Sequence, residues 1–202
     1  MDLQCGQQIV LASASPRRRH IFANAGFQVE IDPVLVNETI PPGTEPAAAV
    51  QTLALSKAAA VAARYPKGVV VGADTIVYHQ RQILEKPHDR AHACHMLQQL
   101  SGNWHTVFTG FALIKLAAKL ELVRAVATRV KFVPLSKEFI EHYVASGEPL
   151  DKAGAYGIQE GGSLLVEQIE GCYFNVMGFP IAAFYLEFQR LFGEHTVADQ
   201  QD

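Results

Sequence analysis

The sequence has few cysteines, and it has no long apolar run. Among its 202 residues are only Cys5, Cys94 and Cys172, an odd and scattered set that argues against a disulfide framework. No window approaches the roughly 20 apolar residues that a transmembrane helix needs. The first residues, MDLQCGQQIVLAS, lack the charged start and long apolar stretch of a signal peptide. We therefore expect a soluble, cytoplasmic protein.

Charge is also sparse. Charged residues make up 18% of the chain, and the net charge is −3. A general nucleic-acid binder needs a broad basic face to displace counterions, so this balance argues against one. A small anionic ligand needs only a local cluster of positive charge and is not excluded. Hydrophobic residues make up 49% of the chain, enough for a core in one α/β domain or two closely packed lobes.

Apolar runs and helical periodicities alternate along the chain, which predicts an α/β fold with a mixed sheet. Two long runs near 104–116 and 121–133 predict an antiparallel pair of strands. We expect one domain over residues 1–202, with a core at about 8–192 and a polar, flexible tail at 193–202. Other strands are predicted near 8–12, 27–32, 68–79 and 163–169, and helices near 16–25, 46–64, 90–100, 137–146 and 179–192.

The segment SASPRRR is typical of a helix start, because Ser15 is a good N-cap and a proline follows it. The simplest interpretation is a helix with solvated arginines. Three arginines in a first turn nevertheless lie at the positive end of the helix dipole, where each is disfavoured by about 0.3–1 kcal/mol. A bound anion would reverse that cost, so Ser13, Arg17 and Arg18 are candidate phosphate ligands. Arg19 is expected to be solvated.

Lys57 lies on the apolar stripe of the helix predicted at 46–64. Lysine is rarely buried without a partner. Its stem can pack on the core while the ammonium reaches water, or the ammonium can point into a cleft toward a phosphate. The spacing alone leaves both alternatives open.

Asp74 and Thr75 follow the apolar run GVVV and two small residues. Ligands gather beyond the carboxyl ends of strands in α/β sheets, so an acid here favours a functional site over a turn cap. Glu38 and Lys86 lie in predicted loops and are unremarkable by themselves.

The glycine-rich segment DKAGAYGIQ allows close approach to a flat ligand, and Gln159 offers both a donor and an acceptor. A flexible connection between strands is the alternative. His88, His92 and His95 share one helical face beside Cys94, but no second ligand cluster supports zinc there. The sequence contains neither a P-loop nor a dinucleotide-binding glycine motif.

Seven segments together resemble one family, the Maf nucleotide pyrophosphatases, over about residues 8–190. In order they are LASASPRRR, the Ala-rich helix with Lys57, VGADTIV, LEKP, LSG, GEPLDKAGAYGIQ and NVMGFP. The resemblance implies an elongated mixed sheet flanked by helices, with a substrate cleft between two lobes, as in Maf and inosine triphosphate pyrophosphatase proteins. It also implies a homodimer and a divalent cation, Mg²⁺ or Mn²⁺.

The resemblance further implies hydrolysis of nucleoside triphosphates to monophosphate and pyrophosphate. Arg17, Thr75 and Gln159 match positions tied to substrate choice in the branch that acts on dTTP and UTP. We expect Asp74 to act as the base, helped by Glu38 in holding the metal because hard cations prefer carboxylates. Lys57 and Lys86 would stabilise the phosphates, Ser13, Arg17 and Arg18 would grip the triphosphate, and Thr75 and Gln159 would face the base or sugar.

Three alternatives remain at this point. One is a nucleotide-binding regulator of cell division with little turnover, which would not require a base such as Asp74. The second is action on modified or purine triphosphates, including that of a 7-methyl-GTP pyrophosphatase, whose branch differs around Gln159. The third is a nucleic-acid binder, which the charge balance disfavours.

Overall fold

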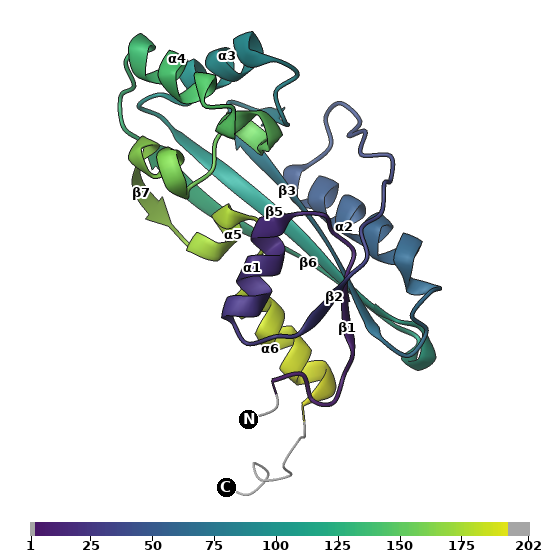
Figure 1. The fold of residues 1–202 in the computed structure, drawn as a ribbon. Helices are drawn as coiled ribbons and strands as arrows, with labels where there is room; N and C mark the ends of the chain where they lie inside the picture. Colours follow the sequence, from purple (N-terminus) through teal and green to yellow (C-terminus); the bar gives the residue numbers. More distant parts are fainter. Residues whose placement is uncertain (1–2, 194–202) are drawn as a thin grey trace, which may run out of the picture.

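In a computed structural model that describes residues 3–193, the chain forms a seven-stranded mixed sheet with helices on both faces (Figure 1). The strand order is β2-β1-β3-β5-β6-β7, and β4 pairs with β3. Only the β1–β2 and β1–β3 pairs are parallel among these strands. The strands are β1 (Ile9–Leu11), β2 (Val29–Ile31), β3 (Val69–His79), β4 (Gln82–Leu84), β5 (Trp104–Lys115), β6 (Leu120–Phe132) and β7 (Val166–Glu170).

The sheet is elongated because β3, β5 and β6 are 11, 12 and 13 residues long and pair antiparallel along nearly their whole length. Their sequences are rich in β-branched and aromatic residues, which favour strands. The predicted α/β class and the mixed sheet flanked by helices are confirmed. The helices are α1 (Pro16–Asn24), α2 (Pro46–Ala62), α3 (Arg90–Leu100), α4 (Lys137–Ala145), α5 (Tyr173–Met177) and α6 (Ile181–Phe192), with 3₁₀ turns η1 (Leu116–Ala118), η2 (Glu148–Asp151), η3 (Ala153–Ala155) and η4 (Glu160–Leu165).

Helix α2 covers one face of the sheet, across β3, β5 and β6. It lies directly on the strand backbones because glycines face it. A Cβ at Gly72 would lie 2.1 Å from the Ala54 carbonyl oxygen, and one at Gly110 would lie 2.3 Å from that of Val50. Any larger residue would push the helix away, so the two glycines set how near α2 comes to β3 and β5.

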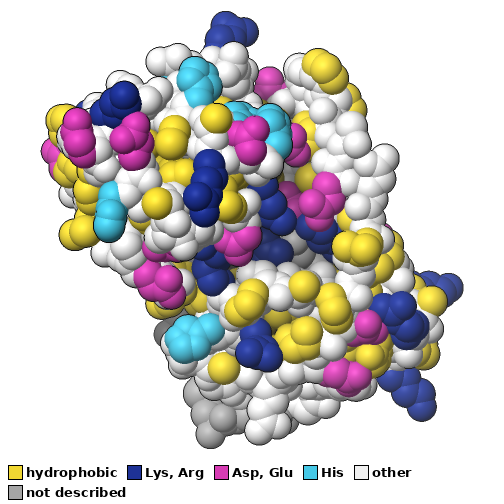
Figure 2. All heavy atoms as spheres, turned by 45° about the horizontal axis from the view of Figure 1, so that its top comes forward, with side chains coloured by type: hydrophobic (Ala, Val, Ile, Leu, Met, Phe, Trp, Pro, Cys, Tyr) yellow, Lys and Arg dark blue, Asp and Glu magenta, His cyan; other side chains and the backbone are white. Residues whose placement is uncertain are grey.

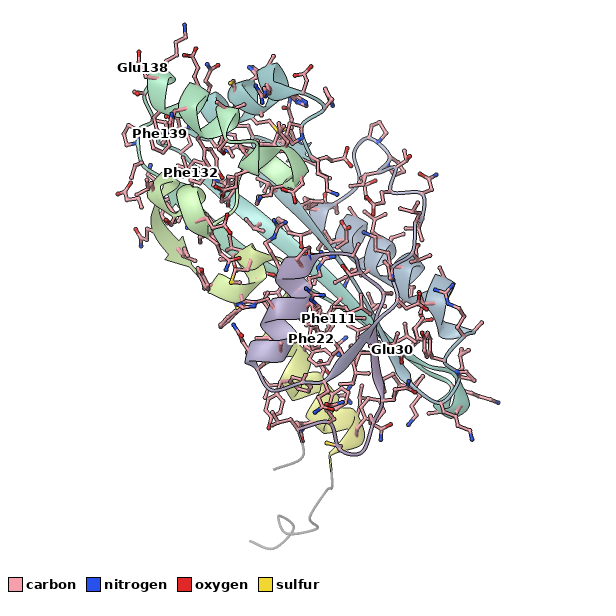
Figure 3. All side chains as sticks on the ribbon, in the orientation of Figure 1. Phe22, Glu30, Phe111, Phe132, Glu138 and Phe139 are labelled. Atoms are coloured by element: carbon pink, nitrogen blue, oxygen red, sulfur yellow. The ribbon has the colours of Figure 1, made fainter. Side chains whose placement is uncertain are left out.

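Two apolar cores lie at opposite ends of the other face. The first, which includes Phe22 and Phe111, packs α1 and α6 against β1, β3 and β5. The second, which includes Phe132, packs α3, α4 and η3 against the far ends of β3, β5 and β6. Figure 3 shows these labelled residues in separate parts of the molecule. We call the two parts the α1–α6 lobe and the α3–α4 lobe.

Most predicted elements are present within a few residues, with two differences. The strand predicted at 163–169 begins only at Val166, because residues 160–165 form a 3₁₀ turn that folds back against Gly157. A Cβ at Gly162 would lie 1.7 Å from the Gly157 carbonyl oxygen. Helix α5 was not predicted. The expected tail, except Gly193, lies outside the described residues.

The three cysteines are free, as expected from their number and spacing. Within residues 3–193, none of the helices combines the length and apolar character required to cross a membrane.

Candidate active site

The candidate site lies at a gap in strand pairing along one edge of β3. Strand β5 pairs with β3 from Val70 to Tyr78 and occupies one edge. On the other edge, β1 pairs with residues 69–71 and β4 with residues 77–79. Residues 72–76 therefore have no strand partner on that edge among the described residues. Asp74 and Thr75 lie in this gap and, because side chains alternate along a strand, point to opposite faces of the sheet.

A cleft of about 730 Å³ runs through the gap and between the two lobes. Figure 2 shows it as a hollow in which Lys and Arg side chains gather beside acidic ones. The predicted cleft between lobes is therefore present. All nine predicted site residues line it: Ser13, Arg17, Arg18, Glu38, Lys57, Asp74, Thr75, Lys86 and Gln159.

One ammonium joins two carboxylates on the α2 side of the cleft. Lys57 Nζ lies 2.6 Å from Asp74 Oδ1 and 2.6 Å from Glu38 Oε1. Lys57 and Asp74 are 8% and 9% exposed, so this pair is largely withdrawn from water. Of the two alternatives for Lys57, the structure favours the one in which its head points into the cleft. Asp74 lies in the middle of β3, within the strand predicted at 68–79, and not beyond the carboxyl end of a strand, where ligands gather in many α/β sheets.

The cationic surroundings act on Glu38. Partial burial alone would raise its pKa, but the hydrogen bond and charge of Lys57, together with the charges of Lys86 and Arg18, lower it below the ordinary value for glutamate. Glu38 therefore stays ionised to lower pH than a solvated glutamate. The same interactions show that Lys86 and Arg18 lie near enough to act on a ligand bound beside Glu38.

Arg18 is buried at the start of α1 and fixed by three hydrogen bonds. Its Nε donates to the Gly178 carbonyl at 2.9 Å, and its terminal nitrogens donate to Ser13 Oγ at 3.1 Å and to Thr75 Oγ1 at 3.2 Å. Burial lowers its pKa, and the charge of Asp74 partly opposes that effect. Each terminal nitrogen carries a second N–H, so the guanidinium can still donate to an anion.

The other two arginines of this segment differ from Arg18. Arg17 is partly exposed at the cleft, with Nη1 3.9 Å from Asp151 Oδ2. Arg19 is exposed, and it is not among the cleft residues, as predicted. Ser15 caps the helix, accepting from the Arg18 backbone N–H.

The opposite wall comes from the loop after β4 and from the segment around η2 and η3. It contributes Lys86 and Gln159, and also Lys152, which was not predicted to have a role. Lys152 Nζ donates to the Glu148 carbonyl and lies 2.9 Å from Asp151 Oδ1. Lys152 lies in the same predicted segment as Gln159, three residues after the proline of GEPLDK.

Four carboxylates line the cleft: Glu38, Asp74, Glu85 and Asp151. Glu38 and Asp74 are the pair that one cation can contact together. Glu38 and Asp74 meet at Lys57, and each keeps a second oxygen outside that contact. Within residues 3–193, no three His, Cys, Asp or Glu side chains group as metal ligands. The imidazole rings of His88 and His92 instead contact each other in a tilted arrangement, with ring centroids 3.8 Å apart.

The chain resembles known nucleotide pyrophosphatases along almost its full length. It is 50% identical over 174 residues to a dTTP/UTP pyrophosphatase of Moorella thermoacetica, covering 86% of this chain and 90% of that protein. It is 46% identical over 185 residues to a dTTP/UTP pyrophosphatase of Koribacter versatilis, covering 92% and 95%. A solved dITP/XTP pyrophosphatase of Mycobacterium abscessus is a distant likeness, with a TM-score of 0.44 and 14% identity over 92% of this chain and 97% of that chain.

The family model described as Maf-like protein matches residues 8–191, a range that contains the gap in β3 and every residue of the cleft wall discussed above. With that match and the two relatives of 50% and 46% identity, the chain belongs to the Maf-like protein family.

Proposed function

We propose that the protein is a cytoplasmic nucleoside triphosphate pyrophosphatase that hydrolyses dTTP and UTP to the monophosphate and pyrophosphate. The observation that carries this proposal is the cluster of Lys57, Asp74 and Glu38 within one cleft that also holds Arg18. Relatives 45–50% identical over most of their length are dTTP/UTP pyrophosphatases. The cleft is lined by cationic side chains, which include Arg18, Lys57 and Lys86, and by Gln159. This lining suits a nucleotide whose triphosphate lies at the cations, the cationic end, and whose base lies at Gln159.

The cationic end binds the triphosphate. Backbone N–H groups at the start of α1 and the guanidinium groups of Arg17 and Arg18 are suited to phosphate oxygens. Lys86 reaches the same space from the α3–α4 lobe. Because the positive groups come from both lobes, the triphosphate bridges the cleft.

Asp74 is placed to act as the general base. A water molecule attacks the α-phosphorus, Asp74 accepts its proton, and the bond between the α-phosphorus and the bridging oxygen breaks to release pyrophosphate. Lys57 holds the Asp74 carboxylate in place through the 2.6 Å contact. Lys57, Lys86 and Arg18 stabilise the negative charge that develops on the phosphates.

A divalent cation, Mg²⁺ or Mn²⁺, fits the two carboxylates Glu38 and Asp74. Mg²⁺ commonly takes only one or two protein carboxylates and completes its shell with water and substrate phosphates, so a larger protein ligand set is not required. When bound, such an ion would polarise the phosphate oxygens. Glu38 suits this role because its lowered pKa keeps it anionic.

The base end of the nucleotide faces Gln159 and Thr75. The Gln159 amide can donate and accept at once, which matches the alternating N–H and C=O groups of uracil and thymine.

We also propose, from the family resemblance, that the protein is a homodimer, which sedimentation equilibrium would test.

Pyrophosphate release from a nucleotide panel tests the proposal. The panel is dTTP, UTP, CTP, 7-methyl-GTP, dITP and ATP, with Mg²⁺ or Mn²⁺, for the wild type, Asp74→Asn and Asp32→Asn. We expect selective release from dTTP and UTP and a loss of about 10²–10³ in rate for Asp74→Asn. Asp32→Asn removes the same charge from an ion pair with Arg64 outside the cleft, so it should retain activity.

Two results would contradict the proposal. Release from none of the nucleotides, with binding still detectable, would favour a nucleotide-binding regulator. Preferential release from 7-methyl-GTP would assign the chain to the other branch. If Asp74→Asn kept more than about a tenth of the wild-type rate, Asp74 would not be the base.

A further inference from the structure

A buried chain of hydrogen bonds lies behind Thr75. Thr75 on β3 is directly opposite Thr109 on β5, and their hydroxyl oxygens are 3.0 Å apart. Thr109 is fully buried, and its Oγ1 lies 3.0 Å from the backbone carbonyl of Asn175 in α5. On its other side Thr75 accepts a hydrogen bond from Arg18. The chain thus runs from the buried arginine through two threonines to helix α5.

The direction of these hydrogen bonds is fixed by counting protons. Each threonine hydroxyl has one proton and two lone pairs. The Asn175 carbonyl can only accept, so the proton of Thr109 points to it; the opposite arrangement would place two acceptors 3.0 Å apart. Thr109 can then offer only a lone pair to Thr75. The proton of Thr75 therefore points inward to Thr109.

The Gly178 carbonyl is a second possible acceptor for the Thr75 proton, but a weaker one than Thr109. The Gly178 carbonyl lies 3.4 Å from Thr75 Oγ1, beyond the 2.5–3.0 Å range of good O–H···O hydrogen bonds, whereas Thr109 lies at 3.0 Å. One lone pair of Thr75 is used by Arg18. Thr75 is partly exposed and lines the cleft, so what remains for a ligand is its second lone pair.

We infer that Thr109 is a positioning residue that holds the proton of Thr75 and makes the Thr75 hydroxyl a hydrogen-bond acceptor toward the cleft. The ligand group that it recognises is then a donor, an N–H or an O–H. This inference rests on the proposed function, in which a nucleoside triphosphate occupies the cleft. The two proposed substrates, dTTP and UTP, share two donors of this class, the ring N3–H and the sugar 3′-hydroxyl. UTP has a 2′-hydroxyl in addition.

Three nucleotides separate the two donors. UTP carries both, CTP has a lone pair at N3 and an amino group in place of the C4 carbonyl, and 3′-deoxy-UTP lacks only the 3′-hydroxyl. For the wild type we expect kcat/KM to fall about tenfold or more for whichever nucleotide lacks the donor that Thr75 accepts. A loss with CTP assigns the ring N–H, and a loss with 3′-deoxy-UTP assigns the sugar O–H.

Thr109→Val tests the positioning role, because valine keeps the shape and removes the hydroxyl. The proton of Thr75 can then turn into the cleft, and the discriminating ratio should shrink to within about threefold. Thr109→Ser keeps the hydroxyl and should keep the wild-type ratio. Thr109→Ala serves if the valine variant does not fold.

A matched control separates positioning from structural damage. Thr128 is an equally buried threonine on β6 that hydrogen-bonds the side chain of Asn175 and the carbonyl of Cys172, without touching Thr75. Thr128→Val should lower kcat/KM for all three nucleotides by a common factor and leave the ratios unchanged.

The inference would be overturned by equal use of all three nucleotides by the wild type, or by a ratio that survives in Thr109→Val. It would equally be overturned if Thr128→Val collapsed the ratio to the same extent. If the wild type releases no pyrophosphate from UTP, the proposed function fails. In that case the role of Thr109 is decided by binding: the dissociation constants of the three nucleotides are compared in the wild type and in the Thr109 variants, in place of kcat/KM.

Discussion

At the scale of single residues, Lys57 has an unusual position. Its ammonium contacts both carboxylates of the proposed base and metal pair, and it is 8% exposed. Removing one partner from such a group leaves a buried charge without compensation, which costs more than the intact pair contributes. Lys57 therefore supports the fold and the chemistry together.

We predict that Lys57→Met lowers the free energy of unfolding by about 3 kcal/mol at pH 8 and abolishes turnover. The cause is the Asp74 carboxylate, which would remain buried opposite Glu38 without its cation. The double variant Lys57→Met/Asp74→Asn should recover most of the lost stability, but no activity. Urea denaturation of the wild type, both single variants and the double variant measures this coupling. Additive losses in the double variant would contradict the prediction.

The sequence predicted which residues meet in the cleft better than how each is held. Asp74 and Thr75 were detected because polar residues directly after a buried apolar run favour a functional site over the alternative of a turn cap. The burial of Arg18, and not Arg17, was not predictable, because it depends on the Gly178 carbonyl 160 residues away. Thr109 gave no signal at all, since a threonine in a strand is ordinary and its partner is fixed only by the register of β3 and β5.

At the scale of elements, helix α2 and strand β3 set the distance between Lys57 and Asp74. Gly72 and Gly110 allow the helix to lie on the strand backbones, and Gly110 is directly opposite Asp74 in the register. The long elements were predictable from periodicity and caps such as Ser15, Asp89 and Ser136. The turn η4 and the five-residue helix α5 were not, because tertiary contacts rather than local patterns determine them.

We predict that Gly110→Ala reduces both stability and activity. The added methyl group would lie 2.3 Å from the Val50 carbonyl oxygen, so α2 must shift and Lys57 must move relative to Asp74. Overpacking of this kind costs about 1–3 kcal/mol. Gly68→Ala is the matched control, because its nearest atoms would be 3.4–3.5 Å away, an ordinary contact. Thermal unfolding and pyrophosphate release measure both effects; equal behaviour of the two variants would show that close packing of α2 is not required.

At the scale of the whole molecule, three long strands carry two cores with the cleft between them. The lobes are thus continuous with one sheet, and damage to the core of the α3–α4 lobe affects the folding of the whole sheet.

The core of the α3–α4 lobe contains a buried titratable group. His105 is 3% exposed, its Nε2 lies 2.7 Å from the Tyr156 hydroxyl, and its ring packs edge-on against Phe132 at 4.8 Å.

Burial, and to a smaller extent the neighbouring His79, lowers the pKa of His105 to about 3. In the unfolded chain a histidine has a pKa of about 6.5. Between these values the unfolded state binds a proton that the folded state does not, so the contribution of His105 to stability is complete above pH 6.5 and is lost as the pH falls toward 3. The slope in this window is at most about 1.4 kcal/mol per pH unit.

We therefore predict that lowering the pH from 7 to 5 costs the wild type about 2 kcal/mol more free energy of unfolding than it costs His105→Gln. Glutamine does not titrate, and its amide can accept a hydrogen bond from the Tyr156 hydroxyl or donate one to it, in place of the imidazole. The variant can be less stable than the wild type at pH 7, because the prediction concerns only how steeply the free energy of unfolding of each protein falls with pH. Urea denaturation at half-unit pH steps measures it. Parallel curves for the two proteins would mean that His105 takes up its proton inside the folded core, and that this core admits a charge without opening.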